Sequence, residues 1–181
     1  MKRTLALTTV LFLVSTLFIV GVCVAGNPVS KSMTGKWTGT LYNMGFCPFD
    51  ASRILTVNVG NGVASGPLGS SNFLFVYCIN LGDLTGYGWG IITTAKGDKL
   101  HVSISNLMVN TAVDPPEWSE EEEIVGGTGM FENASGGSFS QGTWTSGAAE
   151  FPGTYLGPSY PPPLLQPAQG WVGTTVGEIT F

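Results

Sequence analysis

The sixteen residues Ile124-Val-Gly-Gly-Thr-Gly-Met-Phe-Glu-Asn-Ala-Ser-Gly-Gly-Ser-Phe139 decide how this sequence is expected to fold. Five of the 26 glycines of the chain lie in this stretch, and Phe131 follows the densest group of them. Glycines at this spacing allow one strand to end, the backbone to take positive φ values and a second strand to begin. We therefore expect a structural turn at Gly126, Gly127 and Gly129, with Phe131 folded back onto the core.

Short runs rich in β-branched and aromatic residues recur along the rest of the chain, separated by clusters of Gly, Asn, Asp and Pro. Such runs are typical of strands, and no convincing amphipathic helix follows residue 25. Eight strands are enough for a sandwich or a small barrel, so the sequence predicts an all-β fold. The eight candidate strands are Gly35–Tyr42, Ile54–Val59, Asn72–Ile79, Gly88–Ala95, Leu100–Val109, Ile124–Val125, Ser138–Thr145 and Val176–Phe181.

Two further turns are predicted from local composition. Residues 96–98 read Lys-Gly-Asp between two strong strand candidates, which indicates a hairpin, and residues 58–62 read Asn-Val-Gly-Asn-Gly. In the second arm of the hairpin, Leu100, Val102 and Ile104 alternate with polar residues. This alternation predicts a strand with one buried face.

The glycine-rich turn resembles the signature of a known barrel group. Its pattern Gly126-Gly-Thr-Gly-x-Phe131-x-x-Ala134-x-Gly136 is similar to the turn of the dirigent and allene oxide cyclase group, which includes exported bacterial-type members. The ending Gly177-Glu-Ile-Thr-Phe181 resembles the strand that closes these barrels, and Gly35-Lys36-Trp37 more weakly resembles the first strand of lipocalins. The resemblance covers roughly residues 124–145 and the C-terminal end. It implies a single eight-stranded antiparallel, calycin-like barrel that holds an apolar small molecule, and a homo-oligomer as in many plant members.

The N-terminus has the pattern of a secretory signal peptide. Two basic residues, Lys2 and Arg3, precede an apolar run over residues 5–24, and small residues follow. We expect residues 1–25 to form a signal helix that is cleaved, which would make the protein secreted or periplasmic. Two alternatives stay open, namely an uncleaved membrane anchor over residues 5–24, whose length suits a bilayer, and lipid attachment at Cys23.

The remaining chain is expected to form one domain. We predict a linker at residues 26–34 and a barrel domain over residues 35–181, with long loops at 110–123 and 151–170. The second loop holds six prolines, three of them consecutive. Loops of this length are often functional.

Two cysteines, Cys47 and Cys78, lie in the predicted barrel domain. In an exported protein such a pair predicts a disulfide. The bond would close a loop of about 30 residues and stabilise the fold by about 3–4 kcal/mol through the entropy of the unfolded chain. The alternative is two buried thiols, since Cys78 lies in an apolar run.

The charge of the chain argues against a nucleic-acid partner. The full sequence has seven basic and 12 acidic residues, and cleavage after residue 25 would remove two of the basic ones and leave a formal net charge of −7. A negative surface repels phosphate backbones. We expect no nucleic-acid binding, and membrane contact only through an uncleaved N-terminal segment.

No cofactor or metal site is predicted. Gly127-x-Gly129 has Glu132 where a dinucleotide fingerprint needs Gly. His101 is the single histidine, so it cannot build a histidine metal site, and a catalytic triad would depend on it alone. Asp114 and the acidic run 117–123 hold carboxylates that Ca²⁺ prefers. Their spacing does not match a calcium loop, and we expect the run to face water.

The function expected from the sequence is binding, without catalytic residues. The favoured hypothesis is a non-catalytic module for an apolar or aromatic small molecule, because exposed aromatic residues near a barrel opening can stack on such ligands. One alternative is a dirigent- or cyclase-type enzyme that shapes a reactive substrate, and another is a surface or structural interaction protein. The candidate ligand-binding residues are Tyr87, Trp89, Trp118, Tyr155, Tyr160 and Trp171.

Overall fold

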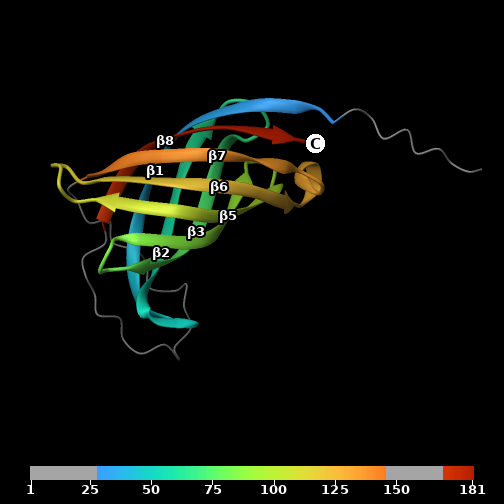
Figure 1. Cartoon of the computed structure of the whole chain (residues 1–181). Helices are drawn as coiled ribbons and strands as arrows, with labels where there is room; N and C mark the ends of the chain where they lie inside the picture. Colours follow the sequence, from blue (N-terminus) through green and yellow to red (C-terminus); the bar gives the residue numbers. More distant parts are fainter. Residues whose placement is uncertain (1–27, 146–168) are drawn as a thin grey trace, which may run out of the picture.

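The computed structural model describes residues 28–145 and 169–181. These residues form a closed antiparallel barrel in which each strand pairs with its neighbours in sequence and the last strand pairs with the first (Figure 1). The predicted eight-stranded antiparallel barrel is confirmed, whereas the expected signal helix lies outside the described residues. The elements of the barrel are β1 Ser30–Cys47, β2 Asp50–Ala64, β3 Gly69–Asn80, β4 Thr85–Thr94, β5 Lys99–Asn110, β6 Glu117–Gly127, the short helix η1 Gly129–Phe131, β7 Ser135–Thr145 and β8 Gln169–Thr180.

Alternation along each strand divides side chains between the interior and the outer surface. In β3, Phe73, Phe75, Tyr77 and Ile79 are buried, while the residues between them are half-buried. Successive side chains of a strand point to opposite faces of the sheet, so a closed sheet places every second residue inside.

The described part of the chain contains no helix with the length and hydrophobicity needed to span a bilayer.

One end of the barrel, the closed end, carries η1 and the C-terminal end of β8, at the right of Figure 1. Gly126 and Gly129 have φ values of 110° and 60°, which glycine adopts at little cost. This backbone path folds Phe131 inward until its side chain is 0% exposed, and its ring stacks on that of Phe181 with 6.1 Å between centroids. Further apolar side chains, from strands and from the turn between β2 and β3, fill the same end, among them Met33, Leu68, Leu100 and Ile179.

The predicted turn at residues 58–62 is wrong, because β2 continues through it to Ala64. Its glycines have a packing role instead. A Cβ atom on Gly62 would lie 2.2 Å from the Trp37 ring, and one on Gly60 would lie 2.5 Å from the Phe73 ring. The glycines of β2 therefore leave room for the rings of Trp37, from β1, and Phe73, from β3, and the chain turns only after Ala64.

The opposite end, the open end, carries the connections β1–β2, β3–β4 and β5–β6, the end of β7 and the start of β8. Two predicted boundaries are wrong, one at each end of the barrel. The expected loop at 110–123 shrinks to residues 111–116, because β6 already begins at Glu117. The expected linker at 26–34 overlaps β1, whose residues 30–34 pair with residues 176–180 of β8.

A disulfide joins Cys47, at the end of β1, to Cys78 in β3, as predicted. Strand β2 lies between these two strands in the sheet. Cys47 is buried and Cys78 is half-buried. The bond therefore fixes the end of β1 across β2 near the open end. Most of the predicted loop at 151–170 lies outside the described residues.

Candidate functional site

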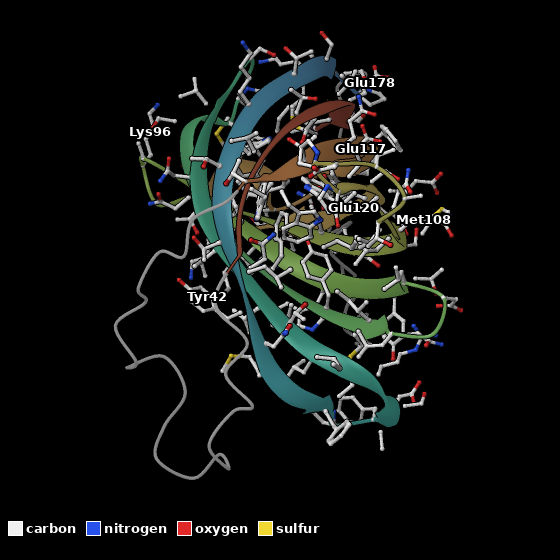
Figure 2. All side chains as sticks on the ribbon, turned by 90° about the vertical axis from the view of Figure 1, so that its left-hand side faces the viewer. Tyr42, Lys96, Met108, Glu117, Glu120 and Glu178 are labelled. Atoms are coloured by element: carbon white, nitrogen blue, oxygen red, sulfur yellow. A yellow bond between two sulfur atoms is a disulfide. The ribbon has the colours of Figure 1, made fainter. Side chains whose placement is uncertain are left out.

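Strand β6 brings two carboxyl groups into the barrel. Trp118, Glu120, Glu122 and Ile124 share one face of this strand, and both glutamates are buried. Figure 2 looks in from the left-hand side of Figure 1 and shows Glu120 inside the ring of strands. The expectation that the whole acidic run faces water is therefore wrong for these two residues. Only the alternate glutamates of β6 are exposed.

Glu120 is 2% exposed, accepts a hydrogen bond from Tyr77, and also interacts with the carboxyl group of Glu122. The Tyr77 hydroxyl donates to Glu120 Oε1 at 3.2 Å, whereas Oε2 has no partner among the described residues. Burial raises the pKa of Glu120 well above its ordinary value, and the nearby charge of Glu122 raises it further, while the bond from Tyr77 opposes the shift. Glu120 therefore favours its protonated form.

Glu122 lies in a more polar setting than Glu120. The hydroxyl of Ser138 donates to Oε2, and that of Ser140 donates to Oε1 at 2.9 Å. Since the Ser140 proton is used in this way, the Thr175 hydroxyl donates to Ser140 Oγ at 2.6 Å. Burial raises the pKa of Glu122, and the two serine hydroxyls partly offset that effect.

A second polar pair crosses the interior beside these groups. The indole Nε1 of Trp171, in β8, donates to Asn58 Oδ1, in β2, at 2.7 Å.

Burial raises the pKa of Tyr77 well above its ordinary value, and the charge of Glu120 adds to the shift. Tyr77 is therefore a neutral phenol that acts as a hydrogen-bond donor to Glu120.

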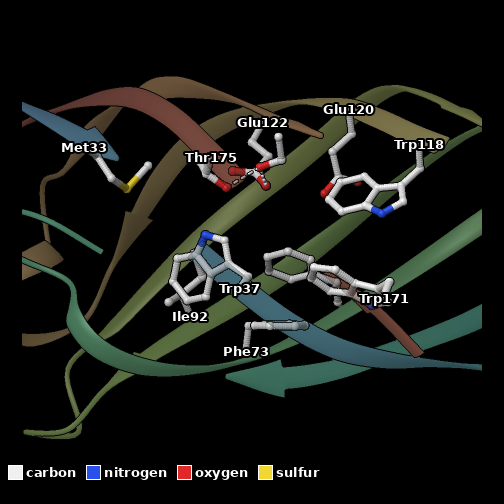
Figure 3. A pocket seen from close by; sticks show the side chains of 11 residues that line it. Met33, Trp37, Phe73, Ile92, Trp118, Glu120, Glu122, Trp171 and Thr175 are labelled. Atoms are coloured by element: carbon white, nitrogen blue, oxygen red, sulfur yellow. Dashed lines mark hydrogen bonds between the residues drawn. The ribbon is translucent and has the colours of Figure 1, made fainter. Parts of the chain in front are cut away.

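Aromatic rings cover the interior wall opposite the glutamates (Figure 3). The Phe73 ring lies 5.9 Å from Trp37, 5.0 Å from Phe75 and 5.5 Å from Trp171, measured between centroids. Trp118 meets Trp171 edge to face at 5.0 Å. These are ordinary distances for favourable ring packing, so the wall is a preformed aromatic surface.

Two small cavities that are partly open to solvent lie between this wall and the carboxyl groups. Each holds about 20 Å³, which is enough for roughly one water molecule. Trp118, Glu120 and Trp171 line both. The first is also lined by Met33, Trp37, Phe73, Phe75, Ile92, Glu122, Ser140 and Thr175, and the second by Leu41, Asn58, Tyr77, Ile79, Leu107, Val109 and Trp144. No lysine, arginine or histidine of the described chain lines either cavity.

The structure separates the predicted ligand-binding residues. Trp118 and Trp171 lie together in the interior, with Trp118 half-buried and Trp171 buried. Tyr87 and Trp89 are exposed on the outer surface of β4, where the Arg53 guanidinium lies 5.2 Å from the centre of the Tyr87 ring. Tyr155 and Tyr160 lie outside the described residues. The predicted set therefore does not form one site.

Four polar residues of the interior were missed at the sequence level, namely Asn58, Tyr77, Glu120 and Glu122. The spacing of the last two carries a usable signal, because they alternate with period two between Trp118 and Ile124. For Asn58 the neighbouring glycines suggested a turn. For Tyr77, apolar residues on both faces of the run hide which face is interior.

The described residues contain no group of three or more His, Cys, Asp or Glu side chains placed to hold a metal ion. Comparison with protein-family models, with curated proteins and with solved structures finds no match for this chain. The interior chemistry is therefore the basis for a functional assignment.

Proposed function

We propose that this protein binds a small aromatic or apolar molecule through the interior of its barrel. The proposal rests on one observation: the two cavities are lined both by aromatic rings and by polar atoms that have no hydrogen-bond partner within the described chain. Glu120 Oε2 and Trp118 Nε1 are buried and have no hydrogen-bond partner among the described residues. Ligand sites commonly combine an apolar lining with a few polar groups that fix orientation.

The size of the cavities defines how a ligand would bind. Drug-sized ligands occupy sites of about 300–1,000 Å³, far more than the 20 Å³ of either cavity. The interior as it stands admits a water-sized group. The body of the ligand therefore takes its place nearer the open end, where Trp118 and Trp144 are only half-buried.

A fluorescence titration with the neutral probe N-phenyl-1-naphthylamine, which reports direct binding of the probe, tests this proposal. We expect saturable binding with one site per chain, and we expect Trp118→Leu to weaken it at least about tenfold. Trp89→Leu is the matched control, because Trp89 is 54% exposed on the outer surface. Loss of binding in the Trp89 variant alone would move the site to the outer face of β4.

A second candidate is an enzyme that performs acid–base chemistry in the same interior, as the resemblance to dirigent and cyclase proteins implies. One observation favours it, namely that Tyr77 and Glu120 are hydrogen-bonded to each other and point inward. A protonated carboxyl beside a phenol can supply a proton to a bound substrate. If the protein is such an enzyme, Glu120→Gln should abolish turnover of the substrate and leave substrate binding largely intact.

A further inference from the structure

The interior of the barrel lacks a positive charge to match its two carboxyl groups. Glu120 and Glu122 are both buried, and no cationic side chain of the described residues lines their cavities. The arginine of the described chain, Arg53, is engaged on the outer surface, where it pairs with Asp50 at 3.1 Å. A buried carboxylate is costly unless a positive charge pairs with it, and without such a partner the group tends to hold its proton instead.

The two carboxyls differ in what they can accept. Both oxygens of Glu122 already accept hydrogen bonds from the hydroxyls of Ser138 and Ser140. Glu120 accepts one bond, from Tyr77, and its second oxygen is free among the described residues. Once Glu120 has lost its proton, Oε2 is therefore the acceptor that an incoming donor group would meet.

The surroundings of this oxygen also suit a cation. Trp118, Trp171 and the rings of Phe73 and Phe75 line the cavity that Glu120 borders. Faces of aromatic rings attract organic cations, most strongly when both are removed from water. The cavity has room for a group the size of a water molecule, which is also the size of an ammonium group.

We propose that the ligand is an aromatic or alkyl amine, bound as its ammonium ion with the charged group on Glu120 and the aromatic wall. This inference rests on the proposed binding function and specifies the ligand class. The ammonium group donates a charge-assisted hydrogen bond to Glu120 Oε2. The apolar body of the amine lies toward the open end, against Trp118 and Trp144.

Binding of the ammonium ion is coupled to loss of one proton. Burial raises the pKa of Glu120 and so favours its protonated form in the free protein. When the ammonium ion enters, this proton passes to the buffer, and the charge of the interior is unchanged. The titratable groups that face Glu120 are Glu122, on the same strand, and Tyr77 on β3. The facing side chains from β2, β7 and β8 are Asn58, Ser140, Trp171 and Thr175, none of which titrates in this range. Affinity therefore rises about tenfold per pH unit as long as free Glu120 holds its proton.

Isothermal titration calorimetry with three ligands of similar shape tests the inference. The ligands are 2-phenylethylammonium, 2-phenylethanol and 3-phenylpropionate, at neutral pH in two buffers of different ionisation enthalpy. We expect the ammonium ion to bind at least about tenfold more tightly than the alcohol, with release of about one proton. Glu120→Gln should remove this preference, and Glu123→Gln, which neutralises an exposed carboxyl on the outer face of β6, should preserve it.

The outcomes separate this inference from the function on which it rests. If the alcohol or the carboxylate binds as tightly as the ammonium ion, the amine specificity is wrong and the binding function stands. Equal binding of the alcohol would mean that an ordered water satisfies Oε2. If none of the three ligands nor the neutral probe binds, both proposals fail. Should Glu120→Gln not fold, proton release and the pH dependence of the unaltered protein decide the question.

Discussion

The two ends of the barrel bury different chemistry. At the closed end, Phe131, Leu68 and Leu100 pack with at most 1% of their surface exposed. Toward the open end, the interior holds a tyrosine and two glutamates, the only buried carboxyls of the described chain. Apolar burial stabilises a fold, whereas buried carboxyls reduce its stability at neutral pH. One end therefore maintains the barrel, whereas the other lowers its stability at neutral pH.

The largest effect is expected from Phe131→Ala at the closed end. The change removes a fully buried ring that stacks on Phe181. Such truncations cost about 3–5 kcal/mol, measured as a loss of unfolding free energy in urea. Met130→Ala is the control, because Met130 is 45% exposed, and it should change stability by less than about 0.5 kcal/mol. A small effect at Phe131 would show that the turn does not close the core.

A slightly smaller effect is expected from removing the disulfide. The double change Cys47→Ala and Cys78→Ala releases a loop spanning a sequence separation of 31. The loop-entropy model gives a loss of about 3–4 kcal/mol, again measured in urea under oxidising conditions. Reductant should destabilise the unaltered protein by a similar amount and leave the double variant unchanged. Equal stability with and without reductant in the unaltered protein would contradict the structural role of this bond.

These two features were accessible from the sequence because each depends on local chemistry. The glycines at 126 and 129 indicate positive φ values, and an even pair of cysteines in a chain with a signal-like N-terminus indicates a disulfide. Alternation at Leu100, Val102 and Ile104 likewise predicted a buried face, and all three are buried. The eight strands followed from composition, and the resemblance of the turn selected the barrel.

The polar residues of the interior could not be predicted from the sequence in the same way. A run of four glutamates is usually solvated, and its separation into two inward and two outward residues depends on closure of the sheet around them. Asn58 meets Trp171 across a separation of 113 residues. Such a contact follows from the register of eight strands, which no local pattern contains.

An intermediate effect is expected from Glu120→Gln, and it depends on pH. The pKa of Glu120 is raised in the folded protein, so the folded state retains a proton that the unfolded state loses above about pH 4.5. Unfolding free energy should therefore fall by about 1.4 kcal/mol per pH unit from there to the folded-state pKa. Glu122, whose pKa is also raised, adds a similar dependence of its own.

Thermal or urea unfolding between pH 4 and pH 8 measures this effect. Glu120→Gln should reduce the slope of unfolding free energy against pH by the contribution of one proton. The variant should therefore be as stable as the unaltered protein near pH 4 and more stable than it at neutral pH. Glu123→Gln should keep the full decline because Glu123 is exposed on the outer face. A Glu120→Gln profile parallel to that of the unaltered protein would place the charge of Glu120 in contact with solvent.

The smallest effect on stability is expected from Trp118→Phe, with Trp171→Phe as its matched partner. The indole N–H of Trp171 bonds to Asn58, and losing it leaves a buried acceptor unpaired, which costs about 1–3 kcal/mol. The N–H of Trp118 has no partner among the described residues, so its removal relieves a buried donor and offsets the loss of ring area. We therefore expect Trp118→Phe to change unfolding free energy by less than about 1 kcal/mol. If it costs as much as Trp171→Phe, the Trp118 N–H already has a hydrogen-bond partner, and the indole nitrogen is not an unsatisfied donor.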